Sequence, residues 1–131
     1  VRTVWLVPTV PETARAEHLS QVAAIIIVIG LVAVTEELAF RGLILGALDR
    51  MAGPIVAVGA SALLFSAYHA VNLLGGRTLD QVAGQMLGSA LFGAALGVVT
   101  CSLRNIAPAI AGHWLLNAMP SIEGLAALAG R

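Results

Sequence analysis

Lysine is absent from this chain, and charged residues of all kinds make up only 11% of its 131 positions. A soluble domain typically carries about 25% charged residues, so charge cannot cover most of this surface. Because 59% of the residues are hydrophobic, lipid is the solvent that such a surface fits. The formal net charge is zero, and without a basic patch we expect no nucleic-acid partner.

Cysteine is also scarce, since Cys101 is the single example. One thiol cannot form a disulfide within the chain, and it cannot build a zinc site of the structural, cysteine-based type. The length fits one compact domain. Any metal or catalytic site must therefore come from other residue types.

Long apolar segments are what the chain does have. We expect an all-α fold, a polytopic transmembrane bundle of about four membrane-embedded helices. The second and third segments are long enough to span a hydrocarbon core of about 30 Å, the first exceeds it, and the fourth is short. The four segments cover residues 19–48, 54–74, 82–103 and 106–119.

Turn and cap residues set the expected ends of these helices. Gly53 and Pro54 predict a turn over residues 49–54. Thr78 is a plausible N-cap for the third helix, and Pro120 is expected to close the fourth. The division that we expect is an interfacial or truncated N-terminal segment, a membrane core and a C-terminal tail, at residues 1–18, 19–120 and 121–131.

Small residues recur at helical spacing in the third segment. Gly84 and Gly88 are four apart, as are Gly93 and Gly97. Pairs of this kind let transmembrane helices approach closely, so we expect tight packing along both pairs.

Ionisable residues inside apolar segments are costly in a membrane and are candidates for function by default. Here they come from three segments, and an asparagine accompanies them. The residues are Glu36, Glu37, Arg41, His69, His113 and Asn117.

Spacing separates the two adjacent glutamates. Glu37 and Arg41 are four apart, so they share a helix face and can pair. Glu36 is rotated from Glu37 by about 100°, which leaves its carboxylate available. His113 and Asn117 also share a face. Counted from the expected turns at about 1.5 Å per residue, residues 36 and 69 lie at similar depth, and the last pair lies shallower. If helix tilt or a deeper start of the fourth helix supplies this difference, three helices can bring the candidates toward one polar cavity.

Two chemistries fit this set. A carboxylate and an imidazole can hold and deprotonate a water, while a second histidine with an asparagine donates hydrogen bonds to the oxyanion of a hydrolysed amide. Alternatively, Glu36, His69 and His113 are a complete ligand set for a catalytic zinc, with water as the fourth ligand. The chain has no HExxH motif, so zinc ligands would come from different helices. Both alternatives remain open at this point.

Each residue taken alone has an ordinary structural interpretation. The Glu37–Arg41 pair is more often structural than catalytic, Phe65 is expected to pack, and Asn117 alone would join helices. The combination is what indicates a site.

Three motifs carry a resemblance to a known family. EELAFR at 36–41 matches EExxxR, FSAYH at 65–69 matches FxxxH, and HWLLN at 113–117 matches HxxxN. In this order, on successive hydrophobic segments, they resemble the CPBP family of intramembrane proteases, over about residues 20–120. That family includes the type II CAAX prenyl endopeptidases and bacterial relatives linked to bacteriocin processing or immunity.

The resemblance implies peptide-bond hydrolysis within the membrane. It implies that Glu36 is the general base, that His69 is its partner on the water, and that His113 and Asn117 stabilise the oxyanion. The supporting residues that it implies are Glu37, Arg41 and Phe65.

We therefore expect an integral, multi-pass endopeptidase of a prokaryotic plasma membrane, in contact with membrane lipid. Its substrate would be a peptide or protein, prenylated or unmodified. The glutamate mechanism requires no cofactor and the metalloprotease alternative uses Zn²⁺. A non-catalytic immunity or scaffold protein of the same fold is the main alternative. A proton pathway is less favoured, because the third segment offers few polar residues.

Overall fold

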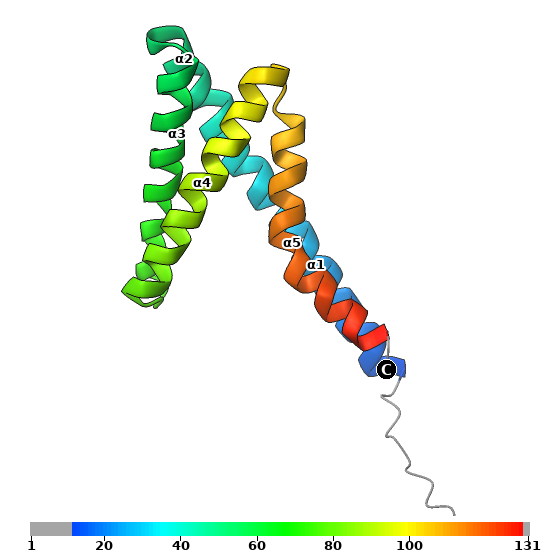
Figure 1. Ribbon diagram of the computed structural model, residues 1–131. Helices are drawn as coiled ribbons and strands as arrows, with labels where there is room; N and C mark the ends of the chain where they lie inside the picture. Colours follow the sequence, from blue (N-terminus) through cyan, green and yellow to red (C-terminus); the bar gives the residue numbers. More distant parts are fainter. Residues whose placement is uncertain (1–11, 130–131) are drawn as a thin grey trace, which may run out of the picture.

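The computed structural model describes residues 12–129, which form an all-helical fold with no strand among them (Figure 1). This confirms the expected fold class. The elements in chain order are α1 (Glu12–Glu37), the π-helix η1 (Leu38–Leu45), α2 (Gly46–Ala52), α3 (Pro54–Tyr68), the 3-10 helix η2 (His69–Leu73), α4 (Leu79–Leu103) and α5 (Ala107–Ala129).

The long helices are arranged as two pairs. α3 packs along α4, and α1 packs along α5, with the two pairs spreading apart toward one end of the molecule (Figure 1). η1 continues from α1 and contacts both α3 and α4, so it joins one pair to the other. The candidate site lies beside η1, where the two helix pairs meet.

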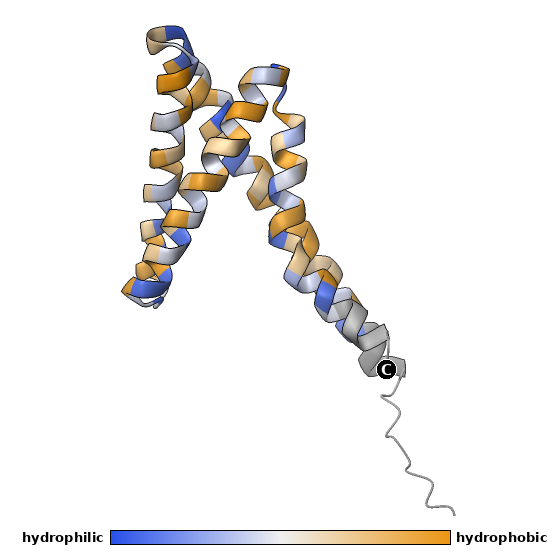
Figure 2. Ribbon diagram, in the orientation of Figure 1, coloured by the Kyte–Doolittle hydropathy of each residue, from blue (hydrophilic) through white to orange (hydrophobic). Residues whose placement is uncertain are grey.

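Three helical stretches are long and apolar enough to cross a membrane, namely Glu17–Ala52, Pro54–Leu73 and Leu79–Leu103. Hydrophobic residues run along all of them, and hydrophilic residues gather at the loops and where α1 passes into η1 (Figure 2). Large apolar side chains such as Leu43 and Ile55 are exposed, by 74% and 88%. Lipid would cover these side chains, and α5 adds the fourth helix.

The first helix is longer than expected at both ends. α1 begins at Glu12 rather than near Leu19, and the helix continues through α2 to Ala52. The turn predicted over 49–54 is confined to Gly53, whose φ of 81° is strained for any residue with a side chain. Residues 49–52 contain no helix breaker, and Arg50 in the last turn suits the negative end of the helix dipole.

The start of α4 agrees with the predicted cap. Thr78 Oγ1 accepts a hydrogen bond from the Gln81 backbone N–H, and the Gln81 side chain accepts one from the Thr78 N–H at 3.1 Å. This reciprocal capping box begins the helix at Leu79, a little before the expected residue 82.

The prediction that Pro120 closes the last helix is wrong. α5 runs from Ala107 to Ala129 with Pro120 inside it, so the helix continues past this proline. Proline costs a helix one hydrogen bond and crowds the carbonyl four residues earlier. Such a loss is tolerated in membrane helices that pack on a neighbour, and α5 packs along α1.

Of the two glycine pairs in α4, one lies at a helix contact. A Cβ added at Gly93 would meet Phe65 at 3.1 Å and the Ala62 Cα at 3.4 Å, and one at Gly97 would meet Leu45 and Val58 at 3.3 Å. The expected tight packing is therefore present along this pair. Gly84 and Gly88 have no such neighbour within 4 Å, so close packing there is absent from the described residues.

This difference gives a matched test of packing. Replacing Gly93 by leucine places a side chain against the α3 backbone, and we expect a loss of roughly 1–3 kcal/mol in stability, as for overpacked cores. Gly84→Leu, in the same helix with open space, is the control. Thermal loss of helical circular dichroism in detergent measures both, and equal midpoints would contradict close packing at Gly93.

Candidate active site

The two glutamates lie where the α-helix widens into the π-helix η1. π-helical turns are uncommon and are frequent at functional sites, and this one spans eight residues, Leu38–Leu45. The hydroxyl of Ser61 on α3 donates a 2.8 Å hydrogen bond to the Phe40 carbonyl, and both groups are buried. This bond fixes η1 against α3.

A buried carboxylate connects the first and last helices. Glu37 Oε1 accepts a hydrogen bond from Arg41 Nη1 at 2.9 Å and another from His113 Nδ1 at 2.8 Å. The side chains of Glu37 and Arg41 are fully buried. The predicted ion pair is therefore present, and it also holds an imidazole from α5.

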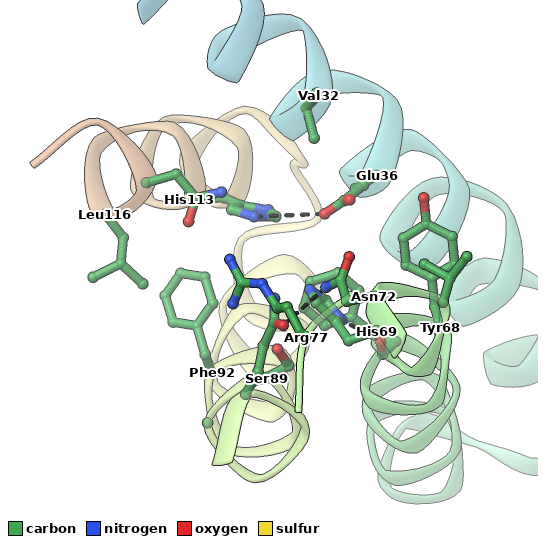
Figure 3. Close-up of a pocket in the computed structure, with 15 residues that line it drawn as sticks. Val32, Glu36, Tyr68, His69, Asn72, Arg77, Ser89, Phe92, His113 and Leu116 are labelled. Atoms are coloured by element: carbon green, nitrogen blue, oxygen red, sulfur yellow. Dashed lines mark hydrogen bonds and ion pairs between the residues drawn. The ribbon is translucent and has the colours of Figure 1, made fainter. Parts of the chain in front are cut away.

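This contact fixes which way the His113 ring faces. Because an ionised carboxylate only accepts hydrogen bonds, Nδ1 is the donor to Glu37. The opposite nitrogen, Nε2, then lies 3.6 Å from Glu36 Oε2 (Figure 3). The Glu36 side chain is 15% exposed, whereas that of Glu37 is 0% exposed, so Glu36 is the carboxylate that remains accessible.

Phe65 occupies the centre of the site, in agreement with its expected packing role. Its side chain is 1% exposed, and the Arg41 guanidinium lies over its ring, 4.4 Å from the centroid, in a cation–π contact. The rings of His69 and His113 meet it edge to face, at centroid distances of 4.8 and 5.7 Å. Phe65 therefore separates the buried ion pair from His69.

The change from α3 to the tighter η2 turn orients His69. The His69 backbone N–H donates to the Ser66 and Ala67 carbonyls and not to the Phe65 carbonyl four residues earlier. The Phe65 carbonyl accepts a hydrogen bond from the His69 ring Nδ1 instead, at 2.9 Å. Since a carbonyl can only accept, Nδ1 carries the hydrogen. In the neutral tautomer with the hydrogen on Nδ1, Nε2 is the acceptor.

One cavity of about 540 Å³ is lined by all four residues for which a catalytic role was predicted, Glu36, His69, His113 and Asn117 (Figure 3). Three separate segments supply them, namely α1, η2 and α5. Phe65 also lines the cavity, whereas Glu37 and Arg41 do not and lie behind it. A volume of this size is typical of ligand sites, at about 300–1,000 Å³.

Sequence reasoning missed part of the lining. Arg77, from the loop before α4, and Gln85, Ser89 and Phe92, from α4, also face the cavity. The three α4 residues are spaced four and three positions apart, so they share one helix face, and the sequence offered this spacing as a signal. Arg77 had no such signal, because a loop residue has no periodicity that would give its direction.

The zinc alternative is not supported by this arrangement. Within residues 12–129, no three His, Cys, Asp or Glu side chains are grouped so that they could hold a metal ion. Glu36 Oε2 and His113 Nε2 face each other at 3.6 Å, but His69 is not grouped with them as a third ligand.

Residues 18–119 match the family model described as type II CAAX prenyl endopeptidase Rce1-like. The chain belongs to this family. Searches of the curated proteins and of the solved structures gave no match.

Membership in the Rce1-like family confirms the resemblance that the three motifs indicated, since all three lie inside the matched residues. The family is one of CAAX-type proteases that work in membranes, so the chain is a protease with a peptide or protein substrate. Family membership and the three apolar helices together identify an integral membrane protein.

The buried pair behind the cavity gives a stability prediction. Arg41→Met leaves the Glu37 carboxylate buried without its cation, and we expect a loss of about 3–5 kcal/mol, as for other broken buried pairs. Denaturant unfolding in detergent measures this loss.

Two variants control this test. Glu37→Gln with Arg41→Met removes both charges and should recover part of the stability. Arg50→Met, at an exposed arginine of α2, should change little. An Arg41→Met protein as stable as Arg50→Met would show that the pair does not stabilise the fold.

Proposed function

We propose that this chain is an intramembrane endopeptidase that hydrolyses a peptide bond with a water activated by Glu36. The observation that supports it best is the single cavity lined by Glu36, His69, His113 and Asn117. A carboxylate, two imidazoles and an amide provide a base and several hydrogen-bond donors in one place. Such a set is what amide hydrolysis requires.

Glu36 and His69 activate the water. The Glu36 carboxylate is the accessible one of the two glutamates, and it accepts a proton as the water attacks the carbonyl carbon. His69 presents Nε2 as an acceptor for the second hydrogen of the same water, because its Nδ1–H is bonded to the Phe65 carbonyl. Holding the water at two points orients it for attack.

His113 and Asn117 stabilise the oxyanion that forms on the carbonyl oxygen. The Asn117 amide donates directly. Nε2 of His113 donates when it carries a proton, and the carboxylates of Glu36 and Glu37 beside the ring balance that charge. Hydrogen-bond donors that point at a developing negative charge stabilise the transition state most strongly in a site that excludes bulk water.

Breakdown of the tetrahedral intermediate returns the proton. Glu36, which received it from the water, transfers it to the nitrogen of the scissile bond as that bond breaks. The products are a carboxylic acid and an amine, the acid then passes its proton to the amine to give a carboxylate and an ammonium group, and Glu36 ends as the carboxylate with which it began. No cofactor takes part in this sequence of steps.

Removing the base tests the proposal. Glu36→Gln keeps the size of the side chain but cannot accept the proton, and we expect a fall in cleavage rate of about 10²–10⁴. The assay follows a peptide library, with prenylated and unmodified members, incubated with the protein in liposomes.

Glu123→Gln, at an exposed glutamate of α5, is the matched control, and a chelator arm tests for metal. Full activity in a folded Glu36→Gln protein would refute the assignment of the base and would favour a non-catalytic role for the cluster. Loss of activity on chelation, rescued by Zn²⁺, would refute the metal-free mechanism.

Removal of an oxyanion donor should have a different kinetic signature. Asn117→Ala is expected to lower kcat by about 10²–10³ with little change in KM, because the hydrogen bond forms fully only in the transition state. Leu115→Ala, at an exposed leucine of the same helix, should leave both constants near their starting values. A change confined to KM would instead indicate a role in substrate binding.

A further inference from the structure

A second group of polar side chains lines the catalytic cavity, and the proposed hydrolysis uses none of them. Arg77, Asn72, Gln85 and Ser89 come from η2, the following loop and α4. In Figure 3 the side chains of Arg77, Asn72 and Ser89 lie together, across from the Glu36–His113 pair. We call these four residues the donor cluster.

The loop that carries Arg77 is held in a defined conformation. The backbone N–H groups of Gly75 and Arg77 both donate to the Asn72 carbonyl, at 3.1 and 3.2 Å. Gly76 has a φ of 84°, which lets the chain reverse there without strain. The capping box at Thr78 then fixes the next residue on the way into α4. The backbone at Arg77 is therefore held in one conformation by these hydrogen bonds.

The donor cluster has an excess of hydrogen-bond donors. Asn72 Nδ2 donates to Gln85 Oε1 at 2.8 Å, which uses the Gln85 acceptor and leaves its amide N–H groups for the cavity. Ser89 adds a hydroxyl and Arg77 a guanidinium. None of the ion pairs formed within residues 12–129 includes Arg77. A positive charge with neutral donors beside it fits an anion.

The geometry points to a carboxylate of the peptide substrate as this anion, and the inference rests on the proposed function. A guanidinium binds a carboxylate through two parallel hydrogen bonds, and a peptide can supply one from its C-terminus or from an Asp or Glu side chain. Arg77 is exposed, as an arginine that binds a lipid phosphate would be, but it lines the same cavity as Glu36 together with the neutral donors of Gln85 and Ser89, and this shared lining favours the peptide carboxylate over the lipid. The donor cluster thus binds the substrate at a distance from the scissile bond.

The test compares peptides that differ only in their carboxylates. One cleaved peptide is prepared as the C-terminal acid, as the C-terminal amide, and with each Asp or Glu near the scissile bond replaced by Asn or Gln. Cleavage in liposomes of neutral lipid, repeated in liposomes that contain anionic lipid, gives kcat/KM, and fluorescence anisotropy gives the Kd of the same peptides. The proteins are wild type, Arg77→Gln and, as a matched control, Arg50→Gln.

We expect wild type and Arg50→Gln to prefer one carboxylate-bearing peptide over its neutral partner by at least about tenfold, the scale of a charge-assisted hydrogen bond. Arg77→Gln should reduce this preference to near unity, and Arg77→Lys should restore only part of it. Preference for the acid over the amide identifies the C-terminus, and preference for Asp or Glu over Asn or Gln identifies a side chain.

Equal preference in wild type and Arg77→Gln would overturn the inference while leaving the endopeptidase proposal intact. An Arg77→Gln defect that is the same for every peptide and depends on anionic lipid would assign Arg77 to a lipid phosphate, which also overturns it. Should Glu36→Gln cleave normally, the hydrolytic mechanism fails, and the anisotropy comparison still decides the carboxylate site because it requires no turnover.

Discussion

The buried carboxylate of Glu37 is the interaction on which the site depends. It accepts hydrogen bonds from Arg41 in η1 and from His113 in α5, two elements that are far apart in the sequence. Charges inside a membrane are costly unless they are paired, so this arrangement strongly favours one relative position of the two helices. Arg41 extends the same restraint to the other helix pair, because its guanidinium lies against Phe65 and close to Gly93.

Anchoring Glu37 also determines where Glu36 can point. Adjacent residues on a helix project about 100° apart, so a fixed Glu37 leaves its neighbour directed into the cavity. One carboxylate thus compensates the cation and orients an imidazole, while the other stays accessible beside that imidazole, 3.6 Å from its Nε2. The same chemical group has two roles because burial differs, at 0% against 15% exposure of the side chain.

Much of this could be predicted from local spacing, and the rest depends on contacts that spacing does not describe. The Glu37–Arg41 pair and the membrane helices follow from helical periodicity, and the motifs indicated which residues to expect in one cavity. The Glu37–His113 bond joins residues 76 positions apart and could not be read from either helix alone. Pro120 was misjudged because its effect depends on the neighbouring α1, and Arg77 was missed because its direction is set by backbone hydrogen bonds in a loop.

Hydrolysis inside a lipid-facing bundle requires a supply of water, and the lining of the cavity suggests its route. Apolar side chains, including Val32, Val71 and Leu116, share the lining with the donor cluster. Polar groups thus lie on both sides of the cavity, with the donor cluster across from Glu36 and His113. Water entering from the loop would meet hydrogen-bond partners throughout, while an extended peptide could satisfy its own backbone groups on the same surface. In the proposed mechanism the donor cluster serves both the water and the peptide, and this role accounts for the polar residues on the side of α4 that faces the cavity.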